Sequence, residues 1–266
     1  MSQYSEHETE MTEAVSRMVG GKKTLNYFTH LHEEIGFIYF SAPAVANIRT
    51  TASLNLAVAE TLGVKFGYQD LGAVYKRQSS IVAGPKGVGP GVFAEMLDDP
   101  DVVKLTFLRD PVERFAALYR RVFSINTMRA RPRVQLFGHL GIPVEENLSM
   151  LDLAELLCEE EELKLQLPHL RSQRQMAAFD LVDYSFIGRH ETWEDDFSRI
   201  SQEIFGRDVA QFDPIKVFNQ DPEGVELQGN VDAETRAALE EAYREDYEML
   251  EEVDELFPGG FAGQSG

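Results

Sequence analysis

Arg109, Asp110, Pro111 and Arg114 place two guanidinium groups around an expected turn from strand to helix. The turn follows a β-branched and apolar run at residues 101–108, which is typical of a buried parallel strand. Asp110 is a favoured N-cap residue, and Pro111 suits the first helical position, where no amide hydrogen is needed. Ligands of open parallel sheets bind at the carboxyl ends of the strands, and a guanidinium can hold a phosphate bidentately. Arg109 is therefore a candidate anion-binding residue, although Arg-Asp-Pro alone also occurs simply as a helix-start turn.

A second candidate anion site lies between an expected buried strand at residues 36–41 and an expected helix at residues 52–62. The loop that joins them contains small residues and ends in Arg49, Thr50 and Thr51. Such a loop presents backbone amides and a helix N-terminus to an anion. It lacks the spaced glycine and the Gly-Lys-Ser/Thr of a Walker A motif, which disfavours a small-molecule kinase. A strand followed by a short loop is also ordinary α/β core, so other segments must decide its meaning.

A third group of polar residues occupies residues 167–176, where His169, Arg171 and Gln173 alternate with other residues. A neutral imidazole near pH 7 can accept the proton of a hydroxyl group. His169 is therefore a candidate general base. The alternative is a hydrogen-bonded structural histidine.

Residues 109–117 resemble the Arg-Asp-Pro-x-x-Arg-hydrophobic-x-Ser signature of the sulfotransferases, in particular the carbohydrate (Golgi-type) family. In that family the first Arg and the Ser hold the 3′-phosphate of the donor, 3′-phosphoadenosine 5′-phosphosulfate (PAPS). Arg109 and Arg114 match the signature, whereas Ala117 stands at the Ser position. The resemblance implies that Arg109 and the position of Ala117 lie at the donor's 3′-phosphate.

The loop after the first strand resembles the family's Pro-Lys-Val-Ala-x-Thr-Ser loop, which cradles the donor's 5′-phosphate, if it is one or two residues longer. The family lysine, which neutralises charge on the bridging oxygen as sulfate leaves, falls on Ala44. Losing one such donor typically costs ~10²–10³ in rate. Arg49 is the candidate substitute for it. The donor-binding residues implied by the resemblance are Val45, Ala46, Asn47, Ile48, Arg49, Thr50, Thr51, Arg109 and Ala117.

Three further segments are similar to the same family. His169 and Gln173 keep the spacing of a His-x-x-x-Gln segment that lines the acceptor site, which implies His169 as the base and, with Arg49, a catalytic pair. Residues 180–197 and 231–250 resemble an Asp-Phe-Ile-Gly segment and the terminal helix of the family. The order of these segments implies a three-layer α/β/α sandwich with a central parallel sheet, like that of P-loop nucleoside triphosphate hydrolases.

Composition limits the partners of this 266-residue chain. Its formal net charge of −20 argues against nucleic acid, because binding to a nucleic-acid backbone needs a basic surface. The single cysteine, Cys158, excludes an internal disulfide and a cysteine-cluster metal site, and the resemblance implies no metal. No apolar run approaches the roughly 20 residues that span a bilayer. The polar, acidic N-terminus is unlike a signal peptide, so we expect a soluble, cytoplasmic protein without a membrane partner. Because Golgi members of the family carry a membrane anchor that is not seen here, the resemblance implies a bacterial or phage-type member.

The expected organisation has three parts: an N-terminal helical arm at residues 1–35, a sulfotransferase-like domain at residues 36–257 and a disordered tail at residues 258–266. A helix at residues 5–20 is expected to serve packing or homodimer formation, and residues 64–68 are a possible strand. Residues 84–91 hold four Gly and two Pro, which predicts an irregular mobile loop. With Lys76, Arg77 and Lys86 nearby, this loop is either a lid that contacts the acceptor or a solvated connection.

The function implied by the resemblance is transfer of a sulfuryl group from PAPS to a hydroxyl or amine of a carbohydrate or small-molecule acceptor. The alternative is a catalytically impaired descendant that binds a nucleotide, glycan or protein partner. Ala44 and Ala117 favour the alternative, because they replace two polar residues of the family site.

Overall fold

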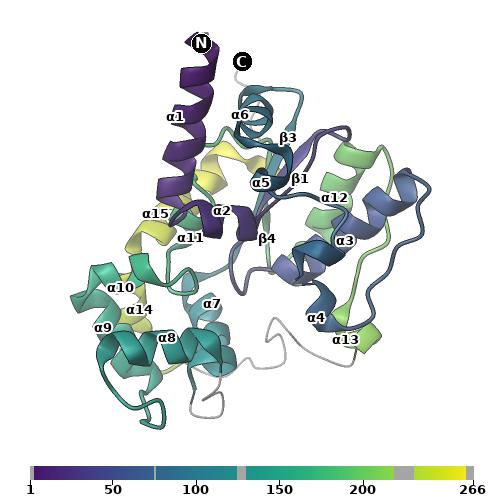
Figure 1. Cartoon of the computed structure of the whole chain (residues 1–266). Coiled ribbons are helices and arrows are strands. Elements are labelled where there is room, and N and C mark those ends of the chain that lie inside the picture. The colour runs from purple at the N-terminus through teal and green to yellow at the C-terminus, as the bar shows by residue number, and fades with distance from the viewer. Residues whose placement is uncertain (1–2, 75, 125–129, 219–230, 262–266) are drawn as a thin grey trace.

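A four-stranded sheet of order β1-β2-β3-β4 lies at the centre of the structure, a computed structural model that describes residues 3–74, 76–124, 130–218 and 231–261 (Figure 1). The strands are β1 (Thr29–His32), β2 (Phe37–Phe40), β3 (Val103–Leu108) and β4 (Phe186–Arg189). β1 runs antiparallel to β2, whereas β2, β3 and β4 run parallel. The prediction of a mixed α/β fold is confirmed, and the expected parallel sheet carries one antiparallel edge strand.

Helices make up most of the remaining structure. They are α1 (Gln3–Met18), α2 (Lys22–Phe28), α3 (Asn47–Thr61), α4 (Leu71–Val74), α5 (Pro85–Val88), α6 (Pro90–Asp98), α7 (Pro111–Leu118), α8 (Arg131–Leu140), α9 (Met150–Glu159), α10 (Glu161–Gln166), α11 (Gln173–Met176), α12 (Trp193–Phe205), α13 (Pro214–Phe218), α14 (Ala233–Ala242) and α15 (Arg244–Leu256). Shorter helical turns are η1 (Arg77–Ser79), the π-helical turn η2 (Tyr119–Phe123) and η5 (Pro258–Gly260). Within the described ranges, no helix is both long and apolar enough to cross a membrane.

Successive residues of β2 point to opposite faces of the sheet, as the two-residue period of a strand requires. Phe37 and Tyr39 join one apolar core with α3 and α12, while Ile38 and Phe40 join another with α1, α6 and α15. Figure 1 shows these two groups of helices on opposite sides of the sheet. The chain therefore forms three layers, α/β/α, and a relation to P-loop hydrolases stays a prediction.

A third apolar core lies among α7, α8, α9, α10 and α14. Figure 1 shows these helices gathered at one end of the molecule, below the sheet. The core includes Ala44 and Ala117, which are 2% and 3% exposed. The two alanines that replace polar family residues therefore pack as apolar side chains.

The N-terminal segment is built into the core. α1 confirms the helix expected at residues 5–20, and Val15 and Val19 are buried against the sheet. β1, which lies inside the expected helical arm, forms a strand instead and pairs with β2 across the predicted boundary at residue 36. A four-residue strand that contains two histidines carries little apolar signal, so the sequence pattern did not reveal it.

The expected disordered tail is ordered at its start. η5 follows α15, and Phe261 forms a bridge with Phe186, whose ring centroid lies 4.9 Å from its own. Residues 262–266 of the predicted tail lie outside the described residues.

The prediction that residues 84–91 lack regular structure is wrong. Pro85 begins α5 and Pro90 begins α6, at positions where proline is favoured. Gly89 separates the helices with φ of 94°, which glycine adopts without strain. The strand expected at residues 64–68 is also wrong, because this described segment has no regular structure.

Candidate functional site

The loop between β2 and α3 has an unusual backbone. Ala44 and Ala46 have φ angles of 60° and 48°, and Val45 lies between them. Alternation of left- and right-handed residues turns successive amides toward one concave side, which is an anion-binding arrangement. The left-handed conformation costs a residue with a Cβ roughly 1–2 kcal/mol, so the surrounding contacts must stabilise it.

The N-terminus of α3 adjoins this loop. Ala46 is its N-cap residue, no side chain caps it, and its first turn contains no acidic residue. The first amides of a helix have no acceptor within the helix, and the helix dipole favours an anion near them. The loop and the start of α3 therefore form one concave group of amides at the carboxyl end of β2.

α3 begins earlier than the sequence pattern predicted, at Asn47 rather than at residue 52. Thr50 donates its amide to Ala46 O at 2.9 Å, and Thr51 lies one residue further into the helix. The expected extra loop residues are therefore part of the helix. The amide cradle consists of Ala44 and of Ala46 to Arg49, because the Val45 amide donates to Ala42 O at 3.3 Å. Helix-compatible residues continue without glycine or proline from Asn47 onward, which explains the early start.

Arg109 lies directly after β3, and its side chain reaches the loop. It is 3% exposed, and its Nη1 donates to Ala44 O at 3.1 Å. Gln173 holds the backbone of Arg109, since Oε1 accepts the Arg109 amide at 2.9 Å and Nε2 donates to its carbonyl at 2.8 Å. The structure therefore brings together the two segments expected to bind the donor's phosphates.

Arg114, the second arginine of the signature, is buried and joins three segments. Its Nε donates to Pro43 O at 3.2 Å and its Nη2 to Arg171 O at 2.7 Å. Its Nη1 lies 3.9 Å from Asp246 Oδ2 of α15, with both side chains at most 1% exposed. These contacts hold the β2–α3 loop, so the role of Arg114 is structural.

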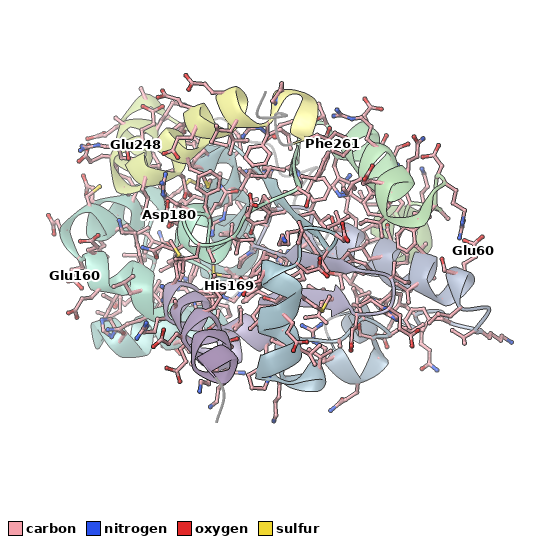
Figure 2. All side chains as sticks on the ribbon, turned by 90° about the horizontal axis from the view of Figure 1, so that it is seen from above. Glu60, Glu160, His169, Asp180, Glu248 and Phe261 are labelled. Atoms are coloured by element: carbon pink, nitrogen blue, oxygen red, sulfur yellow. The ribbon has the colours of Figure 1, made fainter. Side chains whose placement is uncertain are left out.

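His169 lies beside the same loop. Arg114 Nη2, which belongs to the guanidinium bound to Pro43 O, donates to His169 O at 3.5 Å. Burial, together with the charges of Arg121 and Arg114, lowers the pKa of His169 to about 4, so its imidazole is neutral at pH 7. Figure 2 shows His169 toward the middle of the molecule, with Glu60 and Glu160 near its rim.

His190 lies in the turn at residues 189–191, which the resemblance placed near the site, but sequence reasoning gave it no role. Its amide donates to Leu108 O at 2.7 Å, and its Nδ1 is buried with no hydrogen-bond partner among the described residues. Burial and the charges of Arg109 and Arg49 lower the pKa of His190 to about 3. Its position in the sequence could have indicated a role, because His190 directly follows β4 and so lies at the same sheet edge as Arg109.

Arg49 lies on the His190 side of α3. Its guanidinium carbon is 4.7 Å from the centroid of the Trp193 ring, and the indole Nε1 donates to Thr50 Oγ1 at 2.8 Å. Arg49 and Arg109 are thus two cations near the amide cradle, in addition to the structural Arg114. Lys86 lies elsewhere, in α5, where its amide donates to Asn26 Oδ1 at 3.0 Å.

The described residues of the site offer amides, guanidinium groups and imidazoles. The part of the chain that the structure describes contains no cluster of three or more His, Cys, Asp or Glu residues able to hold a metal ion. The chemistry available here is stabilisation of negative charge by amides and guanidinium groups, with two neutral imidazoles beside them.

Comparison with known proteins gives one match. A model of the sulfotransferase family matches residues 93–251, more than half of the 266 residues. The match includes the Arg109 turn, His169 and His190, but not the β2–α3 loop. Searches of curated proteins and of solved structures found no match.

Proposed function

The chain belongs to the sulfotransferase family, and we propose that it transfers a sulfuryl group from PAPS to a hydroxyl or amine of a carbohydrate or small-molecule acceptor. One observation carries this proposal: Arg109 at the end of β3 donates to Ala44 O in the amide cradle at the end of β2. A donor with phosphates at both ends needs two anion-binding groups side by side, and the residues for both are in contact here.

In this proposal Arg109 holds the 3′-phosphate, because a guanidinium has five N–H donors in a planar fork and can serve Ala44 O and a phosphate together. The amides of the cradle hold the 5′-phosphosulfate. His190 adds a buried nitrogen on which the charges of Arg109 and Arg49 act. Water screens the interactions of this site with an anion only weakly, because Ala44 and Arg109 are buried and Arg49 and His190 are partly buried.

The reaction needs little covalent chemistry from the protein. The acceptor oxygen attacks sulfur, the bond between sulfur and the bridging oxygen breaks, and its electron pair stays on the 5′-phosphate oxygen. The amide cradle and Arg49 stabilise that developing charge. His169 accepts the proton that the acceptor hydroxyl loses, since its imidazole is neutral at pH 7. The negative charge of a bound donor offsets the charges of Arg114 and Arg121 and so raises the pKa of His169, which makes it a stronger base.

Ala44 and Ala117 favour a second candidate function. Both side chains are buried in the third core, so neither can supply the charge or hydrogen bond of the family residue. Loss of one hydrogen bond to a charged group costs about 1.5–3 kcal/mol. A protein that binds PAPS-like nucleotides, glycans or a protein partner without transfer is therefore the alternative.

Calorimetric titration with 3′-phosphoadenosine 5′-phosphate (PAP), the desulfated product, tests the proposal. We expect micromolar binding to the wild-type protein and a loss of at least tenfold in Arg109→Lys, which keeps the charge but not the bidentate geometry. Arg207→Ala is the matched control, because Arg207 pairs with Glu60 on the surface. Absence of binding at millimolar PAP would overturn the donor site. Binding without sulfate transfer to any acceptor would support the alternative.

A further inference from the structure

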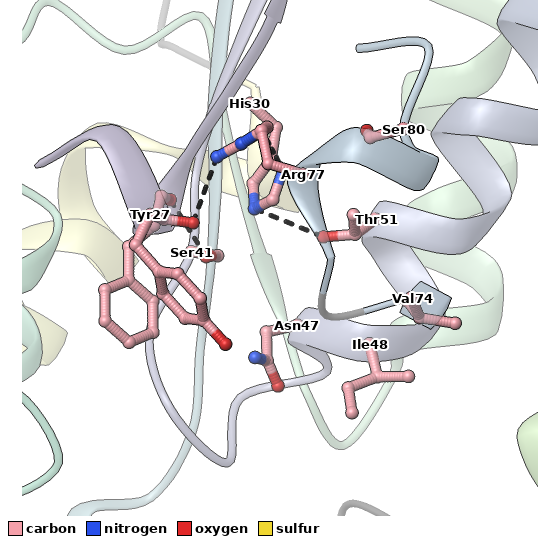
Figure 3. Close-up of a pocket in the computed structure, with 10 residues that line it drawn as sticks. Tyr27, His30, Ser41, Asn47, Ile48, Thr51, Val74, Arg77 and Ser80 are labelled. Carbon is pink, nitrogen blue, oxygen red and sulfur yellow. Dashed lines mark hydrogen bonds between the residues drawn. The ribbon is translucent and has the colours of Figure 1, made fainter. Parts of the chain in front are cut away.

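A small pocket lies between β1 and the start of α3, on the opposite side of that helix from Arg49 (Figure 3). Its volume is about 40 Å³. Asn47, the first residue of α3, and Thr51, one turn further, line it together with Tyr27 and His30. The pocket therefore adjoins the amide cradle at Asn47.

Arg77 forms the back of this pocket and is held in one position. Its Nη2 donates to the carbonyl oxygens of Asn26, Tyr27 and Thr29 at 2.5, 3.0 and 2.8 Å. Its Nη1 contacts Ala83 O at 3.2 Å and His30 Nδ1 at 2.9 Å. Burial lowers the pKa of Arg77 to about 10, so its guanidinium is charged at neutral pH and only donates.

This contact fixes the tautomer of His30. Because Arg77 donates to Nδ1, that nitrogen carries no hydrogen, and the neutral ring carries its hydrogen on Nε2. The Nε2 hydrogen is then directed to Thr51 Oγ1, which lies 3.4 Å away. Burial and the charge of Arg77 lower the pKa of His30 well below its usual range, which agrees with a neutral ring. Thr51 accepts from His30 and retains its own hydroxyl hydrogen as a donor.

The pocket's electrostatics select against cations. Among the described residues that line it there is no carboxylate, although the chain has 45 Asp and Glu residues. Burial raises the pKa of Tyr27, and the positive charges of Arg121 and Arg77 oppose that rise, so both charges act on its hydroxyl. Figure 3 shows this hydroxyl near Asn47. Asn47 Oδ1 is buried with no partner among the described residues, so it can accept a hydrogen bond from a ligand. Hydroxyl and amide groups of this kind suit a neutral polar group.

We propose that this pocket receives the acceptor as a neutral hydroxyl group rather than as an amine, and that Arg77 and His30 are positioning residues that direct the Thr51 hydroxyl toward it. The inference rests on the proposed sulfuryl transfer and narrows its acceptor class. An acceptor hydroxyl held at Asn47 and Thr51 lies next to the amides proposed to hold the phosphosulfate, because Asn47 is the first residue of α3. A protonated amine would instead meet the charge of Arg77 in the pocket lining and that of Arg121 near Tyr27, with no carboxylate among the described residues that line the pocket.

Nitrogen NMR of the histidine side chains tests this inference, with His30 assigned by the signal lost in His30→Gln. We expect the Nε2–H tautomer from pH 5 to pH 8. Ethylene glycol and methylammonium serve as hydroxyl and amine probes, with and without saturating PAP. The His30 signal is expected to shift with ethylene glycol and not with methylammonium.

Four variants separate positioning from simple packing. Thr51→Val should abolish the shift and Thr51→Ser should retain it, while Thr61→Val, in the last turn of α3, is the control for a Thr→Val change in that helix. Arg77→Leu should give His30 a mixture of tautomers. An Nδ1–H tautomer in the wild-type protein, a shift with methylammonium, or no shift with ethylene glycol would each overturn the inference. PAP binding is measured separately, so a failed donor site and a failed acceptor pocket give different results.

Discussion

Gln173 binds both polar groups of the Arg109 backbone, accepting its amide hydrogen at Oε1 and donating from Nε2 to its carbonyl oxygen. The two bonds join α11 to the end of β3, across 64 residues of sequence. Asp246 in turn accepts the Gln173 amide at 3.0 Å. Arg109 is thus placed by Gln173, which is itself held by Asp246 from a distant segment.

Gln173→Glu should lower both stability and PAP affinity. The carboxylate can still accept from the Arg109 amide, but it cannot donate to the Arg109 carbonyl, and it places two acceptors against each other in a buried site. We expect a loss of about 1–3 kcal/mol in the free energy of unfolding, measured with urea. Gln202→Glu on the exposed face of α12 is the control. Equal stability of the two variants would contradict the described role of Gln173.

Arg114→Leu should destabilise the protein by about 3–5 kcal/mol, because it leaves the Asp246 carboxyl buried without its cation. Burial already raises the pKa of Asp246, and Arg114 opposes that rise. Without Arg114 the folded protein binds a proton more readily than the unfolded chain, so stability should fall as the pH rises. Urea unfolding from pH 5 to pH 8 measures this. The double variant Arg114→Leu with Asp246→Asn should recover part of the loss, and simple additivity would argue against the pair.

Buried histidines should make the protein less stable in acid. The pKa values of His169 and His190 are lowered to about 4 and about 3, so below pH 6.5 the unfolded chain takes up protons that the folded state does not. Stability is therefore complete above pH 6.5 and falls toward pH 4, by about 1.4 kcal/mol per group and pH unit. His190→Gln should lower the slope of the free energy of unfolding against pH by the contribution of one proton. His139→Gln, at an exposed position on α8, is the control for a His→Gln change, and an unchanged slope in His190→Gln would contradict the burial argument.

Ala117→Ser should strengthen PAP binding if Ala117 marks the 3′-phosphate position. A new hydroxyl donor to a phosphate contributes about 1.5 kcal/mol at the low end, or roughly tenfold in affinity. Calorimetry with PAP and with adenosine 5′-phosphate isolates the contribution of the 3′-phosphate to binding, since only PAP should bind more tightly to the variant. Ala116→Ser, one residue earlier and equally buried, is the matched control. An equal gain for both nucleotides, or none, would place the 3′-phosphate elsewhere.

The sequence correctly predicted the elements whose own residues form a clear local pattern. β2, β3 and the start of α7 follow from short apolar runs, the Asp110 cap and Pro111, and the structure confirms them. The prediction for the Gly- and Pro-rich segment was wrong because it counted these residues without regard to their position in a helix. Pro85 and Pro90 each begin a helix instead of interrupting one. β1 gave no signal, since its role depends on pairing with β2 rather than on its own residues.

The candidate site shows the same limit. Arg109 and the β2–α3 loop were predicted because each follows a recognisable strand. The proximity of His190 to Arg49 and Arg109, and the contact between Arg77 and His30, arise only when strands that are distant in sequence lie side by side. Spacing along the chain carries no information on such contacts.

The contacts of Arg114 have a consequence for the order of events during synthesis. One guanidinium links Pro43, Arg171 and Asp246, which leave the ribosome at widely separated times. Elongation proceeds at roughly 5–20 residues per second, so the loop after β2 exists for at least about ten seconds before α15 emerges. During that interval the strained alanines have no complete set of partners. A nascent chain or a fragment that ends before Asp246 should therefore contain most of the sheet and yet lack a finished anion cradle.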